Sequence, residues 1–143
     1  MKTFKQYLKE QEDYKIQHRA PGPDGGAPLH DLTGKGEVYP DDVYSKNQRQ
    51  YYGTGDDKMD KKTFDVINKS KGKPESIVEI HRAVPKHVKE INKGDWVTVN
   101  KDYAKEHGDA HLDGDYHIIS KKVPAKHVYT NADSIHEFGY HGD

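Results

Sequence analysis

Apolar residues in the second half of this chain occur in short runs of strand-forming composition, and Pro or Gly bounds each run. The three clearest runs are Ile77–Val84, Trp96–Asn100 and Tyr116–Val123. Pro85 ends the first run, Gly94 lies in the turn before the second, and Pro124 interrupts the chain after the third. Because the runs are rich in β-branched and aromatic residues, we predict that they form strands. A further short strand is predicted around Ala125–Tyr129.

One segment before these strands has a helical pattern. Asp60–Lys71 places Phe64 and Ile67 on one face, and Gly72 and Pro74 follow it. Apolar residues three positions apart fall on one side of an α-helix, and Gly followed by Pro is typical of a helix C-terminus. The combination of short helices with short strands predicts an α+β fold.

A second helix is predicted at Lys101–His107, directly after Asn100. Asn is a favoured N-cap residue, and Gly108 is predicted to end the helix. With the helix ending there, His107 and His111 would not share a face. The ten His residues form neither a His-Glu-x-x-His motif nor a Cys/His finger, so we predict no metal site.

The composition of residues 19–57 predicts a long irregular segment. Residues 19–28 include three Pro and three Gly, a composition that excludes a regular helix or a central strand. The Tyr residues farther along this segment indicate that it docks onto the core. Two interpretations stay open: the segment forms a wall of a ligand cleft, or it packs against the core without a ligand.

Composition limits both the core and the function classes. The 143 residues suit one domain, and with 31% hydrophobic residues its core must be thin. The net charge of -1 excludes a nucleic-acid binder that relies on a strongly basic surface, and a local basic groove stays open. The absence of Cys excludes disulfides, thiol catalysis and Cys-based zinc sites. No apolar run approaches the roughly 18 residues that span a bilayer, so we expect no membrane partner.

Three polar residues lie in or next to apolar runs, in the order Arg82, Thr98 and Glu137. Arg82 shares a predicted strand face with Val78 and Ile80, where a guanidinium group is unfavourable unless it finds an anion. Glu137 lies in a late segment of sequence His-Glu-Phe-Gly-Tyr. These residues predict a nucleotide-handling site. The other interpretation is a buried structural ion pair between Arg82 and Glu137.

The order of these residues resembles the Arg–Ser/Thr–Glu class of ADP-ribosyltransferases. The three matching motifs are Ile80–Val84, Gly94–Asn100 and Ser134–Tyr140, and the resemblance covers residues 19–143. It implies an α+β, ADP-ribosyltransferase-like fold with a split β-sheet core, short helices and a long N-terminal loop. It also implies that NAD is the substrate, as in phage and prophage domains of this type.

The family assigns a role to each of the three residues. By resemblance, Arg82 would bind the diphosphate or ribose of NAD, Thr98 would support the catalytic carboxylate, and Glu137 would be that carboxylate. These roles suit the chemistry, because an Arg fork binds diphosphate and a carboxylate stabilises positive charge on the ribose as nicotinamide leaves. Further residues expected to line the NAD site are His81, Trp96, Tyr103 and Phe138.

Two positions depart from the family pattern. Ile135 stands where members that modify Arg carry Glu and others carry Gln, so the acceptor is not implied by the resemblance. The Ser-Thr-Ser triplet is replaced by Val97–Val99, which leaves Thr98 alone in its role. His81, next to Arg82, keeps open the family class whose first motif residue is His.

The N-terminus resembles the capsid-targeting leaders of internal head proteins from T-even-type bacteriophages. Met1–Phe4 leads to Leu8-Lys9-Glu10, and in that family a prohead protease cuts after Leu/Ile-x-Glu. The resemblance implies a cleavable leader at residues 1–10 and a single domain at residues 11–143. The other interpretation of residues 2–16 is an ordinary amphipathic surface helix.

The two resemblances together imply an NAD-dependent mono-ADP-ribosyltransferase of the glycosyltransferase class that modifies a host protein or nucleic acid. It would be a monomer, packaged in the phage head by way of the capsid interior and prohead protease, and then released into the host cytoplasm. A hypothesis from another class is a non-enzymatic internal head protein that binds and inhibits a host defence factor. Transfer of a phosphate from RNA to NAD is a third, for which His81, Arg82 and His117 are too few basic residues.

Overall fold

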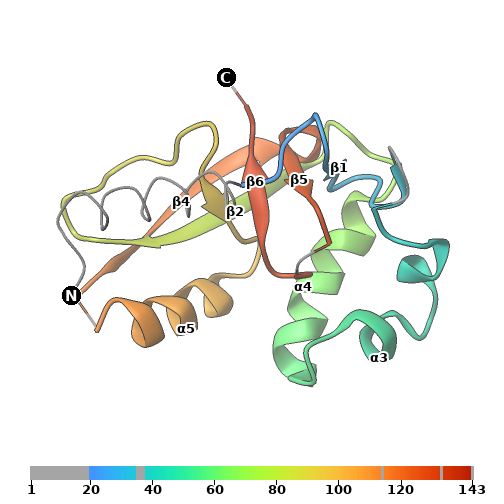
Figure 1. Cartoon of the computed structure of the whole chain (residues 1–143), viewed down its shortest axis with the longest axis horizontal. Helices are drawn as coiled ribbons and strands as arrows, with labels where there is room; N and C mark the ends of the chain where they lie inside the picture. Colours follow the sequence, from blue (N-terminus) through green and yellow to red (C-terminus); the bar gives the residue numbers. More distant parts are fainter. Residues whose placement is uncertain (1–19, 35–37, 114, 133, 143) are drawn as a thin grey trace, which may run out of the picture.

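The computed structural model describes residues 20–34, 38–113, 115–132 and 134–142 (Figure 1). Over these residues the chain contains three α-helices and two small antiparallel sheets, which confirms the predicted α+β class. The helices are α3 (Gln48–Tyr52), α4 (Asp57–Ser70) and α5 (Lys101–His111), with 3-10 turns η1 (Asp41–Tyr44) and η2 (Ala125–His127). The strands are β1 (Ala27–Pro28), β2 (Ile77–Val84), β3 (Trp96–Val97), β4 (His117–Pro124), β5 (Val128–Thr130) and β6 (Phe138–Tyr140).

The two sheets meet at a backbone bridge. One sheet has the order β1-β5-β6-β3, and the other pairs β2 with β4 along eight residues each. His81 of β2 bridges to Thr98, the residue after β3: the His81 N–H donates to the Thr98 carbonyl at 2.8 Å, and the Thr98 N–H donates to the His81 carbonyl at 2.9 Å. Strand β2 and the residue that directly follows β3, which belong to the first and second predicted motifs, are therefore neighbours in space.

Helix α4 begins three residues earlier than predicted. The Asp56 side chain accepts a hydrogen bond from the Met59 N–H at 3.1 Å and so caps the helix. Phe64 and Ile67 are buried as expected, and Gly72 follows the helix with a φ of +72°, which only Gly adopts without strain. Two carboxylates in the first turn favour this N-terminus through the helix dipole.

Helix α5 contradicts the predicted stop at Gly108, because it continues to His111. The predicted cap is confirmed: the Asn100 side chain accepts hydrogen bonds from the N–H groups of Asp102 and Tyr103. Gly108 is needed for packing, since a Cβ there would lie 2.5 Å from the ring of Tyr116. Tertiary packing thus overrides the weak helix propensity of Gly.

The N-terminal segment carries more regular structure than its composition predicts. Within residues 20–57, β1 pairs with β5, and η1 and α3 follow. Leu29, Leu32, Tyr39 and Val43 are buried in the central cluster, which confirms that this segment docks onto the core. The expected leader at residues 1–10 and the amphipathic helix at 2–16 lie outside the described residues.

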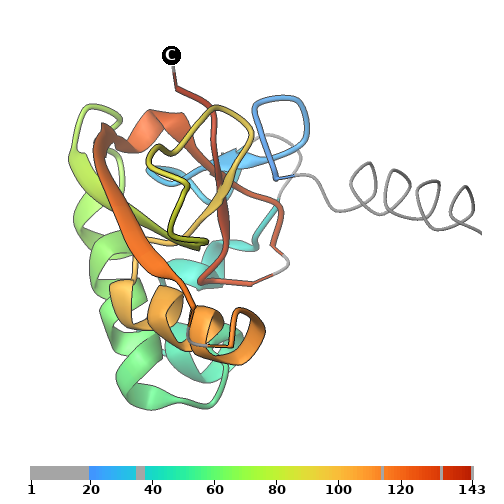
Figure 2. The same cartoon turned by 90° about the vertical axis from the view of Figure 1, so that its left-hand side faces the viewer.

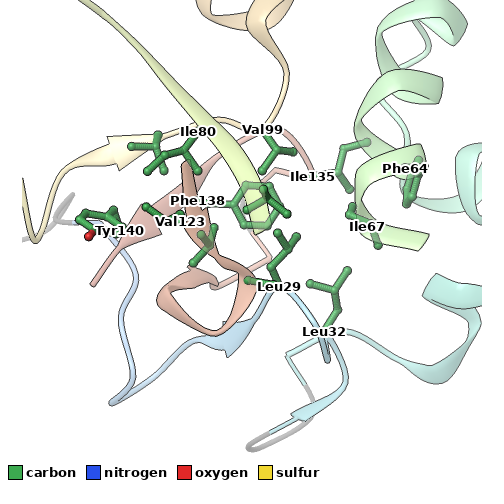
Figure 3. Packing of buried hydrophobic residues seen from close by; sticks show 14 of the residues in the cluster. Leu29, Leu32, Phe64, Ile67, Ile80, Val99, Val123, Ile135, Phe138 and Tyr140 are labelled. Carbon is green, nitrogen blue, oxygen red and sulfur yellow. The ribbon is translucent and has the colours of Figure 1, made fainter. Parts of the chain in front are cut away.

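The core lies between the sheets, helix α4 and the docked N-terminal segment (Figure 3). Figure 3 shows Phe138 and Ile135 among Ile80, Val99 and Val123, with Phe64 and Ile67 of α4 closing one side. In Figures 1 and 2, α5 lies at the end of the molecule opposite the C-terminus, and β6 begins on that side. None of the described helices is long and apolar enough to cross a membrane.

Candidate active site

The strand register brings the three predicted segments together. In the antiparallel pair of β3 and β6, Trp96 lies opposite Gly139 and Val97 lies opposite Phe138. Thr98 directly follows β3 and Glu137 directly precedes β6, so these two residues flank the same end of the β3–β6 pair. Since Thr98 also bridges to β2 at the residue before Arg82, the chain segments that carry the three polar residues are adjacent.

Glu137 is half-buried directly before β6, and its carboxylate is held by a residue of helix α5. The Tyr103 hydroxyl donates a hydrogen bond to Glu137 Oε1 at 2.8 Å. Burial and, after it, this hydrogen bond to Glu137 raise the pKa of Tyr103 well above the usual tyrosine value. Tyr103 is therefore a protonated donor at every physiological pH, and the carboxylate of Glu137 has a fixed partner.

The residue before Glu137 is anchored in the interior. His136 is 1% exposed; its Nδ1 lies 2.7 Å from Thr63 Oγ1 and its Nε2 lies 3.1 Å from Asp60 Oδ1. Burial lowers the pKa of His136, and the nearby Asp60 opposes that effect. Because an ionised carboxylate can only accept, this geometry assigns the proton of the neutral imidazole to Nε2 and makes Nδ1 the acceptor from Thr63.

Arg82 lies on the face of β2 that the alternation predicted, between buried Ile80 and Val84. Its side chain is 35% exposed, and its guanidinium lies 3.5 Å from the Asp95 carboxylate in the turn before β3. Among the described residues Arg82 and Glu137 form no ion pair. The alternative of a structural ion pair between these two residues is therefore wrong, because Asp95 is the partner that Arg82 finds.

The pKa of His107, on helix α5, responds to several neighbouring groups. Burial is the main cause that lowers the pKa of His107, and the neighbouring His111 adds to it. Glu137 raises this pKa and Arg82 lowers it further, so both charges act on the same imidazole ring. The charges of Arg82 and Glu137 therefore both influence the pKa of His107 on α5.

Sequence reasoning missed His107 because it ended the helix at Gly108. In the continuous helix, Tyr103, His107 and His111 are spaced four residues apart and fall on one face. The rings of His107 and His111 lie 4.5 Å apart between centroids. The four-residue spacing was visible in the sequence, but it identifies this face only if the helix passes through Gly108.

Two further predicted site residues, one from the first motif and one from the second, are deeply buried. His81 is 5% exposed, and its Nδ1 lies 2.7 Å from the Ser120 hydroxyl on β4. Thr98 is 4% exposed, and its hydroxyl accepts a hydrogen bond from the Asn100 N–H at 3.2 Å. Within the described part of the chain Thr98 makes no hydrogen bond to Glu137, so the support expected from Thr98 comes from Tyr103.

The aromatic candidates divide between the core and the surface. Trp96 on β3 is half-buried. Phe138 is 1% exposed and packs in the core, so its ring is occupied by packing (Figure 3). Ile135 is 3% exposed in the same cluster, so the side chain at this position is part of the core.

Two cavities lie elsewhere on the molecule. One, of about 350 Å³, lies between α4 and the start of β2 and is lined by His81 and Glu79 among others. The other, of about 370 Å³, lies beside the docked N-terminal segment and is lined by His30 and Tyr44 among others. Neither is lined by Arg82, Thr98 or Glu137. Residues of the N-terminal segment thus line part of the second cavity.

Comparisons add no relative to these observations: no protein-family model, no curated protein and no solved structure matches the chain. No group of three or more His, Cys, Asp or Glu side chains in the described residues is arranged to hold a metal ion. The candidate site therefore consists of Glu137 held by Tyr103, with Arg82 and His107 around it.

Proposed function

We propose that this protein is an NAD-dependent mono-ADP-ribosyltransferase that modifies a host macromolecule. The observation that carries the proposal is the placement of Glu137: the Tyr103 hydroxyl holds its carboxylate, and Glu137 directly precedes β6 at the end of the β3–β6 pair where Thr98 follows β3 and bridges to β2 beside Arg82. A fixed carboxylate and a partly exposed guanidinium around one region are what cleavage of NAD needs. The proposal includes the ADP-ribosyltransferase-like arrangement of the two sheets.

In this proposal each residue acts on a different part of NAD. Arg82 binds the diphosphate or the adjacent ribose through charge-assisted hydrogen bonds. The bond between the nicotinamide nitrogen and the ribose breaks, and its electron pair leaves with nicotinamide as a neutral base. Glu137 stabilises the positive charge that develops on the ribose ring. The acceptor nucleophile then forms the new bond at the anomeric carbon of the ribose, the carbon that carried nicotinamide.

Arg82 suits its role better than His81 does. The Arg82 side chain is 35% exposed, and its ion-pair partner among the described residues is Asp95 at 3.5 Å, so a diphosphate can compete for the guanidinium. His81 has a 6% exposed side chain, and Ser120 and Glu79 occupy its ring nitrogens. These contacts favour the class that begins with Arg over the class that begins with His.

The acceptor belongs to the host in this proposal and is a protein or a nucleic acid. Ile135 is buried, so the acceptor must be recognised by other parts of the surface. Delivery from the head of a phage particle, as a monomer, rests on the resemblance of Met1–Glu10 to capsid-targeting leaders. Recovery of the protein from mature particles with its N-terminus after Glu10 would support that part of the proposal.

The decisive experiment compares wild-type protein with Glu137→Gln in NAD cleavage. Gln keeps the size of Glu and still accepts a hydrogen bond from Tyr103, so the fold and NAD affinity should be retained. Loss of the charge should lower nicotinamide release by about 10²–10³-fold, as for removal of one electrostatic stabiliser of a transition state. Glu90→Gln, at an exposed position in the linker after β2, is the matched control and should keep full activity.

The acceptor class is tested with the same proteins. NAD labelled on its adenylate is incubated with host lysate, and the labelled product is treated with protease or with nuclease. Full activity of Glu137→Gln would refute the assignment of Glu137. Wild-type protein that releases no nicotinamide, and that millimolar NAD does not stabilise against heat, would instead favour the non-enzymatic head protein.

A further inference from the structure

We infer that Tyr103 is a positioning residue, which holds the Glu137 carboxylate in the orientation required for NAD cleavage. This inference rests on the proposed function. The evidence is the 2.8 Å hydrogen bond from the Tyr103 hydroxyl to Glu137 Oε1, the one hydrogen bond that this carboxylate receives within the described residues. A carboxylate with one strong donor has one of its two oxygens fixed and leaves the other for substrate.

The Tyr103 ring packs against the side chain of His136, which is itself hydrogen-bonded in the interior. It stacks on the His136 imidazole with ring centroids 4.7 Å apart and planes inclined by 25°. His136 is in turn bonded to Thr63 and Asp60 of helix α4, in the interior of the molecule. Glu137 follows His136 in the chain, so the donor and the acceptor of the bond share one anchor.

The backbone of Tyr103 is fixed by the cap of its helix. Its N–H donates to Asn100 Oδ1 at 3.3 Å, and the amide group of Asn100 donates to Thr63 Oγ1 at 3.1 Å and to the Met59 carbonyl at 2.9 Å. Asn100 therefore ties the start of α5 to α4. Helix, ring and hydroxyl of Tyr103 are all determined by contacts outside the carboxylate itself, which is what preorganisation requires.

Tyr103 takes the part that the resemblance gives to Thr98. The Thr98 hydroxyl is buried and already accepts a hydrogen bond from the Asn100 N–H. This role differs from the expected contact of Tyr103 with NAD. Its hydroxyl donates to Glu137, and one face of its ring stacks on His136.

Tyr103→Phe is the variant that tests this inference, because it removes the hydroxyl and keeps the ring on His136. The expected result is a fall of about 10- to 100-fold in kcat for nicotinamide release, the range for loss of a hydrogen bond to a charged group. The dissociation constant for NAD and the melting temperature should stay close to wild type. The matched control is Tyr116→Phe, which removes hydroxyl contacts at 2.6 Å to Asp109 and 3.0 Å to the Lys105 carbonyl on the far side of the same helix.

A readout without turnover accompanies the kinetics. In protein labelled with ¹³C-Glu, the Glu137 carboxyl resonance is assigned by its loss in Glu137→Gln, and it should move in Tyr103→Phe and stay in place in Tyr116→Phe. A Tyr103→Phe protein with kcat within twofold of an active wild type would overturn the inference and leave the proposed function standing. An equal loss of kcat and NAD affinity with a lower melting temperature would overturn it too, since it would show a merely structural Tyr103. Wild-type protein inactive on NAD would remove the proposed function, and the inference with it.

Discussion

Replacing Asp60 with Ala should destabilise the protein through the contacts that anchor His136. Asp60 is 2% exposed, yet its carboxylate accepts four hydrogen bonds. The donors are His136 Nε2 at 3.1 Å, the Thr54 N–H at 2.8 Å, the Thr54 hydroxyl at 2.8 Å and the Gly55 N–H at 3.2 Å. Asp60 therefore connects α4, the segment after α3 and the segment before β6.

The expected cost follows from the exposure of these donors. Thr54 and Gly55 are exposed, so water can replace Asp60 there, and each lost bond costs about 1 kcal/mol net. His136 is 1% exposed and its Nε2 would be left without an acceptor, at about 1–3 kcal/mol. The sum is a loss of about 4–6 kcal/mol in the free energy of unfolding, or about 15 °C in melting temperature for a chain of this size.

Urea unfolding followed by circular dichroism measures this loss. Asp57→Ala is the matched control on the same helix: its side chain is 83% exposed and pairs with Arg49 at 3.1 Å, so its removal should change stability by less than about 0.5 kcal/mol. An Asp60→Ala protein that loses less than about 1 kcal/mol would refute the reasoning, because it would show that the buried imidazole does not depend on its carboxylate.

Two further predictions concern pH and packing. Burial lowers the pKa of His136 and of His81, so below about pH 6.5 the unfolded chain binds more protons and the free energy of unfolding should fall between pH 7 and pH 5, by up to about 1.4 kcal/mol per pH unit for each residue. Urea titrations across this range should give a shallower slope for His136→Gln than for wild type; equal slopes would contradict the assignment. Gly108→Ala should destabilise the protein by about 1–2 kcal/mol despite the better helix propensity of Ala, because the added methyl meets the Tyr116 ring at 2.5 Å. In a Tyr116→Ala background the same change should be stabilising, and thermal melts of the four proteins compare the two cases.

Local patterns predicted one strand to the residue and others wrongly. The predicted strand around Ala125–Tyr129 is a 3-10 turn at Ala125–His127 followed by β5, and the predicted strand Trp96–Asn100 ends at Val97. The expected strand Ile77–Val84 has the same bounds in the structure, because alternation and a following Pro define it without long-range contacts. The end of α5 was predicted wrongly at Gly108, since the reason for a Gly there is contact with Tyr116, eight residues farther along the chain. Only the tertiary structure reveals such a contact.

The order of the candidate-site residues along the chain was predictable from the sequence, but their side-chain contacts were not. The sequence placed Arg82, Thr98 and Glu137 in or next to three separate strand segments, and the bridge and register between β2, β3 and β6 make these segments neighbours. Which side chain holds which depends on the side from which α5 approaches, and no sequence pattern specifies that. For this reason Tyr103 was expected to contact NAD, although its hydroxyl binds Glu137.

Under the proposed function, the burial of residues 135–140 limits how the choice of acceptor can change. From residue 135 to residue 140, Glu137 is the one position that is not buried. Any other substitution in this stretch alters the core, so selection for a new acceptor has almost no freedom there. Under the proposed function, variation among descendants of this chain should accumulate on the exposed linker between β2 and β3 and on the outer face of α5, while residues 135–140 stay nearly constant.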